Sequence, residues 1–154
     1  MFRIGLVVNP DAGLGGRLGL KGSDGLALKA RAEGAEDRAG PRARSAMALL
    51  EKALTKYGAT VLISEGRMGS EWLDSESDIN TIVVHESRGI TSHEDTRELV
   101  KILVNQGVDL ILYAGGDGTT RDLIQTLEEN ESSNIPIVGI PCGVKMYSGC
   151  FASS

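Results

Sequence analysis

The glycine-rich stretch at residues 113–120, Tyr-Ala-Gly-Gly-Asp-Gly-Thr-Thr, constrains the fold more than any other part of the chain. The apolar run at residues 109–113 leads into it and is typical of a buried strand in a parallel sheet. A helical pattern follows at residues 121–129. The inward face of that helix is predicted to carry Leu123, Ile124 and Leu127. The stretch is therefore predicted to be the turn of a strand-turn-helix unit, which indicates an α/β fold.

The residue types in this turn suit the phosphate groups of a ligand. The glycines, which carry no Cβ to keep a polyphosphate away from backbone N–H groups, are Gly115, Gly116 and Gly118. Thr119 or Thr120 is predicted to cap the helix, whose first N–H groups and dipole favour an anion. A carboxylate among phosphate-binding glycines would repel that ligand. Asp117 is therefore expected either to hold Mg²⁺ or to take a proton from an attacking hydroxyl group.

Strand and helix patterns alternate along the whole chain, which predicts a parallel, doubly wound sheet with right-handed crossovers. The 154 residues are enough for one domain with a substantial core, so we expect a single α/β nucleotide-binding domain over residues 1–154. Strands are predicted at residues 3–8, 60–63, 79–84, 109–113 and 135–140, and helices at residues 43–57, 92–107 and 121–129.

Three local patterns add further expectations. The helix at residues 43–57 is predicted to bury one stripe, made of Ala46, Leu49, Leu50, Ala53 and Leu54. Ser92 with Asp95 three residues later predicts a capping box at the start of the next helix. Trp72 is expected to anchor a short turn in a polar segment.

Ligands of doubly wound sheets bind beyond the carboxyl ends of the strands. Three segments with glycine and polar groups leave strands on this side, at residues 9–25, 115–120 and 141–148. The first segment lacks the Walker A pattern, because no Gly-Lys-Ser or Gly-Lys-Thr triplet stands at the required position. It also lacks the dinucleotide fingerprint, because Leu18 falls where the last glycine is needed. It is either a flexible surface loop or a loop that folds over a nucleotide, with Asn9, Arg17 and Lys21 as polar contacts. One shared anion site would explain all three segments.

Charge and composition argue against several classes of partner. The net charge of −5 argues against nucleic acid as the main partner. Up to Ser45, however, eight Lys and Arg residues stand against five Asp and Glu residues, so the glycine-rich first segment lies in a basic third. No apolar run is long enough to span a membrane, and the N-terminus lacks the pattern of a signal peptide. We therefore expect a cytoplasmic protein without a membrane partner.

The cysteines and histidines give no sign of a disulfide framework or a zinc site. Cys142 and Cys150 match neither a CxxC pair nor a secreted disulfide pattern, so reduced thiols are expected. His85 and His93 have no Cys or His cluster beside them. Both histidines are predicted to lie in loops or at a helix start.

Three motifs, taken in order, resemble one family. Asn-Pro-x-Ala-Gly-x-Gly-Gly-Arg follows the first strand, Gly-Gly-Asp-Gly-Thr follows a later strand, and Gly-Ile-Pro-Cys-Gly-Val-Lys-Met covers the last. Together they resemble the ATP-NAD kinase family, and more closely its branch that includes the acetoin-catabolism X-type proteins. Gly-Gly-Asp-Gly-Thr also occurs in diacylglycerol and sphingosine kinases. The resemblance extends over essentially the whole chain.

The resemblance implies a phosphofructokinase-like α/β domain, followed in the family by a β-rich second domain. Such kinases use Mg²⁺ and transfer the terminal phosphoryl group of ATP, or of inorganic polyphosphate, to the 2′-hydroxyl of the adenosine ribose of NAD, which gives NADP. The implied partners are thus the small-molecule nucleotides ATP and NAD.

The resemblance also implies roles for particular residues. Asp117 would be the base or the carboxylate that orients the acceptor. The phosphate-binding turn would consist of Gly115, Gly116, Gly118, Thr119 and Thr120. Asn9, Gly13 and Gly16 would belong to the first nucleotide loop. Asp122 stands where lipid kinases of this superfamily carry an acidic residue, and is either a Mg²⁺ ligand or a solvated residue favoured by the helix dipole. Lys145 is either a phosphate contact or an ordinary exposed lysine.

The sequence stops at Ser154, where the second domain of the family begins. We therefore expect a nucleotide-binding half-site from a fragment or a truncated protein, with an exposed apolar surface that favours a homo-oligomer. Two other functions stay open. One is a kinase for a lipid or another small hydroxyl compound, and the other is a regulatory module that binds a nucleotide and catalyses nothing.

Overall fold

The computed structural model of the chain describes residues 1–13, 36–87, 90–142 and 146–151. Four residues with predicted roles, Gly16, Arg17, Lys21 and Lys145, lie outside the described residues.

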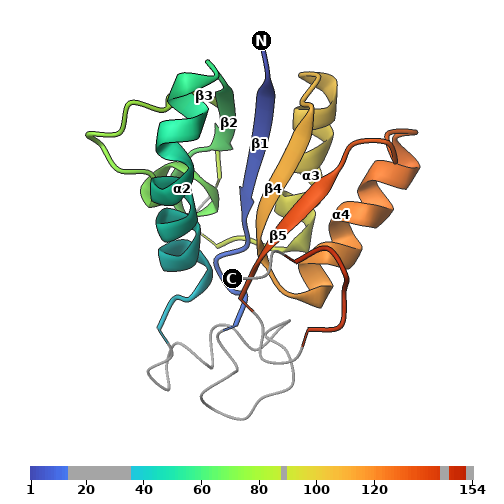
Figure 1. Cartoon of the computed structure of the whole chain (residues 1–154). Coiled ribbons are helices and arrows are strands. Elements are labelled where there is room, and N and C mark those ends of the chain that lie inside the picture. The colour runs from blue at the N-terminus through green and yellow to red at the C-terminus, as the bar shows by residue number, and fades with distance from the viewer. Residues whose placement is uncertain (14–35, 88–89, 143–145, 152–154) are drawn as a thin grey trace.

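The core of the fold is one sheet of five parallel strands in the order β3-β2-β1-β4-β5 (Figure 1). The strands are β1 (Arg3–Val8), β2 (Thr60–Ser64), β3 (Asn80–His85), β4 (Leu110–Gly115) and β5 (Ile137–Pro141). Every predicted strand is present, and the parallel, doubly wound sheet is confirmed. The strand order reverses between β1 and β4, and this switch point is where such sheets bind ligands. Val8 pairs with Ala114, so the segments after β1 and β4 begin side by side.

Helices cover both faces of the sheet (Figure 1). In the described residues they are α2 (Ala39–Lys56), α3 (His93–Asn105) and α4 (Asp117–Glu129), with short 3₁₀ turns η1 (Gly66–Met68) and η2 (Ser70–Trp72) between β2 and β3. Residues of α2 pack with one side of the sheet, and residues of α3 and α4 pack with the other. Alternate residues along the central strands therefore belong to two separate apolar cores.

The predicted inward stripe of α2 is wrong. Of its five residues only Leu54 is buried, while Leu49 is 85% exposed and Leu50 is 38% exposed. The helix begins at Ala39, four residues before the predicted start, and its buried positions are Ala39, Gly40, Ala43, Met47 and Leu54. The small residues let the first turns approach their neighbours closely. A Cβ on Gly40 would lie 2.1 Å from the Trp72 ring, so this contact sets the face that turns inward.

Two local predictions are confirmed, and one is wrong in part. Trp72 closes η2, and its indole N–H donates to the carbonyl of Arg67 at 2.7 Å. Ser92 and Asp95 form the capping box of α3. His93 begins α3 as expected, but His85 is the last residue of β3 and is buried rather than in a loop.

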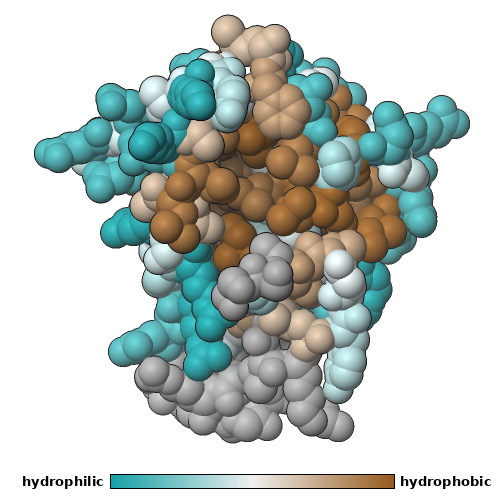
Figure 2. Space-filling model, viewed as in Figure 1, coloured by the Kyte–Doolittle hydropathy of each residue, from teal (hydrophilic) through white to brown (hydrophobic). Residues whose placement is uncertain are grey.

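The two faces of the sheet are covered unequally. Parallel sheets are normally buried on both sides. On the α2 side, the one helix and the short turns that the structure describes leave an apolar surface beside α2, which is visible in Figure 2. Leu110, Val138 and Ile140 pack against the core of this side but are only partly buried, and Phe2 is 47% exposed. Within the described ranges, no helix is long and apolar enough to cross a membrane.

Candidate functional site

Asn9 joins the segment after β1 to the start of α4. Its backbone N–H donates to the carbonyl of Ala114 at 3.0 Å, and its side-chain amide donates to the Thr119 hydroxyl at 2.9 Å. Its side-chain oxygen accepts the backbone N–H of Asp11 at 3.1 Å, which shapes the turn after β1. Asn9 thus lies at the predicted site, where its amide group fixes the position of the loop.

Gly13 and Cys142 bring the first and third loops together. Gly13 has a φ of 81°, and a Cβ on it would lie 2.1 Å from the carbonyl oxygen of Cys142. The N–H of Cys142 in turn donates to the carbonyl of Gly115 at 3.0 Å. The three segments predicted to share one site therefore meet at the carboxyl ends of β1, β4 and β5.

The glycine turn is shorter than predicted, because α4 begins at Asp117 rather than at residue 121. The residue at the N-cap position is Gly116, and neither Thr119 nor Thr120 caps the helix as predicted. The first N–H groups of an α-helix have no carbonyl partner within it, so those of Gly118 and Thr119 are directed at the rim of the sheet. This geometry favours an anion.

The two threonine hydroxyls form contacts inside the protein. Both side chains are buried, and that of Thr119 accepts the Asn9 amide. The hydroxyl of Thr120 bonds the Tyr113 hydroxyl at 2.5 Å and the carbonyl of Gly116 at 3.1 Å. A Cβ on Gly115 would lie 2.5 Å from the Thr119 hydroxyl oxygen, so this glycine is required by packing. What these residues offer a ligand is backbone N–H groups rather than side-chain hydroxyls.

Asp117 binds the segment that follows β5. One carboxylate oxygen accepts the backbone N–H of Tyr147 at 2.8 Å, and the other accepts the N–H of Ser148 at 3.0 Å and its hydroxyl at 2.6 Å. The hydroxyl of Ser148, followed by the two N–H groups, lowers the pKa of Asp117, so this carboxylate is ionised at neutral pH. A carboxylate offers about four acceptor positions. The described residues fill three of them, which leaves one for a ligand atom.

Sequence reasoning placed Asp117 at the centre of the site but missed Tyr147 and Ser148 as its partners. Both lie in the third predicted rim segment, so their proximity to the glycine turn could have been inferred from the sheet topology. A cleft of about 450 Å³ lies beside these residues, between one stripe of α4 and the segment 147–148. Arg121, Ile124 and the exposed Tyr147 are among the residues that line it.

Asp122 lies apart from this group. It is five residues after Asp117, which places it about 140° around the helix. One of its carboxylate oxygens lies 3.8 Å from Nε of Arg97, so it links α4 to α3. The described residues hold no group of three Asp, Glu, His or Cys side chains that could bind a metal ion. The role of Asp122 as a Mg²⁺ ligand stays a prediction.

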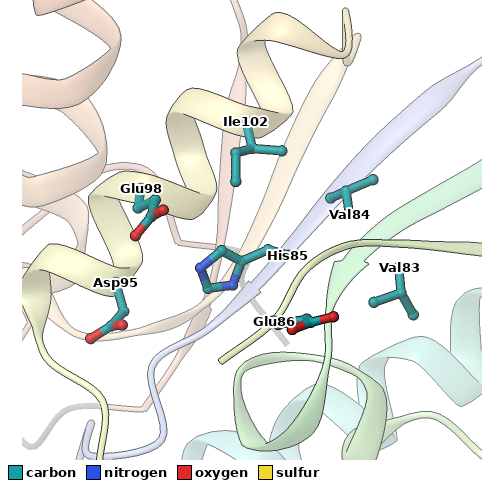
Figure 3. A pocket seen from close by; sticks show the side chains of 7 residues that line it. All are labelled: Val83, Val84, His85, Glu86, Asp95, Glu98 and Ile102. Carbon is teal, nitrogen blue, oxygen red and sulfur yellow. The ribbon is translucent and has the colours of Figure 1, made fainter. Parts of the chain in front are cut away.

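A second cavity, of about 680 Å³, lies at the carboxyl end of β3, next to α3 (Figure 3). His85 and the carboxylates of Glu86, Asp95 and Glu98 line it. Two strands separate β3 from the switch point, and none of the residues predicted to bind phosphate lines this cavity. Its carboxylates would repel phosphate, so it is a poorer candidate for a nucleotide site than the region around Asp117.

Comparison with known proteins identifies the family of the chain. A family model described as the ATP-NAD kinase N-terminal domain matches residues 4–154, which include the three rim segments and all five strands except the first residue of β1. Searches of curated proteins and of solved structures found no match. The chain therefore belongs to the ATP-NAD kinase N-terminal domain family and has the kinase-type nucleotide-binding fold.

Proposed function

We propose that the chain binds ATP or inorganic polyphosphate with Mg²⁺, and supports transfer of the terminal phosphoryl group to the 2′-hydroxyl of the adenosine ribose of NAD, giving NADP. The observation that carries this proposal is the position of Asp117. Its carboxylate is ionised and lies at the first residue of α4, where the segments after β1, β4 and β5 meet.

The phosphate groups of the donor would lie at the switch point between β1 and β4. There the backbone N–H groups of Gly118 and Thr119, together with the dipole of α4, favour negative charge. Asn9 and Gly13 would shape the wall of this site through their contacts with Thr119 and Cys142. Gly115, Gly116 and Thr120 would hold the turn in place. Gly16, which the resemblance assigns to the first nucleotide loop, and Lys145, in the phosphate-contact interpretation, would add to this site.

Asp117 would orient the reacting groups rather than act as a strong base. The hydrogen bonds that lower its pKa also weaken it as a proton acceptor. Phosphoryl transfer depends mainly on positioning and on charge stabilisation, which a fixed carboxylate can supply. Its one open position fits either the acceptor hydroxyl or Mg²⁺, which takes one or two carboxylates plus phosphate oxygens. When bound, Mg²⁺ would neutralise charge on the phosphates.

The acceptor would approach Asp117 from the cleft beside α4. Tyr147 is 84% exposed there and offers an aromatic surface to a base or a nicotinamide ring. Arg121 adds a positive charge that suits the pyrophosphate of a dinucleotide. These groups suit a nucleotide acceptor better than a lipid tail.

A binding module without catalysis is the second candidate function. It is favoured because the carboxylate of Asp117 already accepts three hydrogen bonds from the chain itself. Such a module would bind ATP in calorimetry and transfer no phosphoryl group to any acceptor.

Product analysis with labelled ATP, Mg²⁺ and a panel of acceptors tests the proposal. The chain is assayed alone and, where its gene continues, as the full-length product. We expect label on NAD, and not on diacylglycerol or other hydroxyl compounds. Tyr147→Ala should raise the Michaelis constant for NAD about three- to tenfold, because an aromatic contact is lost. The control Tyr57→Ala removes an exposed ring at the end of α2 and should change nothing. Label on a lipid, or bound ATP without transfer, would support one of the alternatives.

A further inference from the structure

The cavity at the carboxyl end of β3 is a second candidate binding site, and we propose that it binds a small organic cation of the alkylamine or polyamine class. Its volume of about 680 Å³ lies in the usual range for small-molecule sites. Figure 3 shows it between β3 and the amino-terminal half of α3, with side chains from both elements directed into it. The proposal does not depend on the nucleotide site.

His85 gives the cavity a buried imidazole ring that is held on one side by Ser64. The side chain is only 9% exposed, and its Nδ1 lies 2.9 Å from the hydroxyl oxygen of Ser64. That hydroxyl also lies 3.0 Å from the carbonyl oxygen of Glu65 and 3.4 Å from that of His85. When it donates to one of these carbonyls it accepts the hydrogen of Nδ1, and Nε2, which has no hydrogen-bond partner among the described residues, is then an acceptor that faces the cavity. In Figure 3 the ring points toward α3.

The remaining polar side chains that line the cavity are carboxylates. They belong to Glu86 at the end of β3 and to Asp95 and Glu98 on α3. One oxygen of Asp95 accepts hydrogen bonds from Ser92 in the capping box. Among the described residues, no Lys or Arg lines the cavity. A ligand must therefore bring both positive charge and hydrogen-bond donors.

The apolar part of the lining selects an organic ligand. Val84 and Ile102 are half-buried and form a wall beside the acceptor groups. Methylene groups between two ammonium groups would pack on this wall and remove apolar surface from water. An ammonium group would meanwhile donate to Glu98 and to Nε2 of His85. An alkylamine satisfies both parts of the cavity at once.

A nuclear magnetic resonance titration with spermidine as the probe tests this proposal on the full chain. We expect saturable shifts of the amide signals of β3 and α3, and of the His85 Nε2 signal. Glu98→Gln should weaken binding about two- to fivefold, because an exposed ion pair is lost. The control Glu94→Gln removes a carboxylate from the first turn of α3, outside the cavity, and should leave the affinity unchanged.

Three results would overturn the proposal. One is the absence of saturable shifts near His85 with spermidine at millimolar concentration. Another is equal weakening by Glu98→Gln and Glu94→Gln, which would indicate general charge attraction to an acidic protein. The third is displacement of spermidine by MgCl₂ at equal ionic strength, with the same signals shifted, which would indicate a divalent cation site.

Discussion

At the scale of single residues, Asp117 combines two roles that its sequence context does not reveal. It begins α4, and it holds the segment after β5 through the hydrogens of Tyr147 and Ser148. Hydrogen bonds that favour the ionised form lower the pKa of a carboxyl group. The same contacts therefore fix the side chain in one orientation and keep its charge.

Ser148→Ala should raise the pKa of Asp117 toward its ordinary value of about 3.9, because the Ser148 hydroxyl is the largest cause that lowers it. The contact between α4 and residues 147–148 is fully formed at pH values above the ordinary pKa of an aspartate. It is lost as the pH falls through the lowered pKa that Asp117 has in the folded chain. In the variant this loss should begin at a higher pH. Carboxyl-carbon shifts measured against pH report both effects.

The matched control is Ser77→Ala, which removes a serine hydroxyl from the carboxylate of Glu51 at 2.7 Å, a contact between α2 and the polar segment before β3. It should leave the titration of Asp117 unchanged. A Ser148→Ala protein whose Asp117 titrates as in the unaltered chain would show that Ser148 does not hold this carboxylate.

At the scale of elements, the three rim segments are fitted to one another. Asn9 bonds Thr119, Gly13 lies against Cys142, and Cys142 bonds Gly115. These contacts join the ends of β1, β4 and β5, so a change in one segment is expected to displace the others.

Gly13→Ala should destabilise the chain more than Gly107→Ala. Both glycines have a positive φ, so both variants bear the same kind of backbone strain. A Cβ on Gly13 would lie 2.1 Å from the carbonyl oxygen of Cys142, whereas nothing lies within 4 Å of one on Gly107. We expect an excess loss of about 1–3 kcal/mol in the free energy of unfolding for Gly13→Ala, measured by urea denaturation. Equal losses would show that the first and third segments do not touch.

The elements that the sequence predicted well are those with a strong local signal. The apolar runs gave every strand, and the glycine turn gave the junction of β4 and α4. The inward face of α2 could not be predicted, because the contact of Gly40 with Trp72 joins residues far apart in the chain. Ile124 was expected to face inward, but it is 40% exposed. Leu123 and Leu127 are buried as predicted, and the other buried positions of α4 belong to threonines, of which Thr120 bonds Tyr113.

The particular hydrogen bonds of Asp117 could not be predicted for the same reason. Tyr147 and Ser148 are about thirty residues away from it in the chain, and they bond it mainly through backbone N–H groups, which no side-chain pattern reveals. Topology located the rim, but not which atoms meet there.

At the scale of the whole molecule, the described residues cover one face of the sheet more fully than the other. The side of α3 and α4 is packed, while the α2 side shows apolar surface in Figure 2. Continuous apolar patches on a protein surface are often sites of association. We propose that this face joins two copies of the chain.

Val138→Lys should prevent that association, because it places a charge on the partly buried apolar surface of β5. Analytical ultracentrifugation over a range of concentrations should give a monomer for this variant and a dimer or larger species for the unaltered chain. The control Ile82→Lys replaces a half-exposed residue of β3, at the other edge of the sheet. Dissociation by Ile82→Lys alone would place the interface at β3 instead.

Phosphoryl transfer by Asp117→Asn, compared with Asp74→Asn, tests the central claim most directly. Both changes remove a carboxylate that accepts a backbone N–H group, but Asp74 lies in the segment between η2 and β3. NADP formation from NAD, Mg²⁺ and ATP or polyphosphate should fall about a hundredfold or more for Asp117→Asn with the circular dichroism spectrum unchanged, and should be unaltered for Asp74→Asn. A rate for Asp117→Asn equal to that of the unaltered protein would contradict the assignment of Asp117 to the centre of the site.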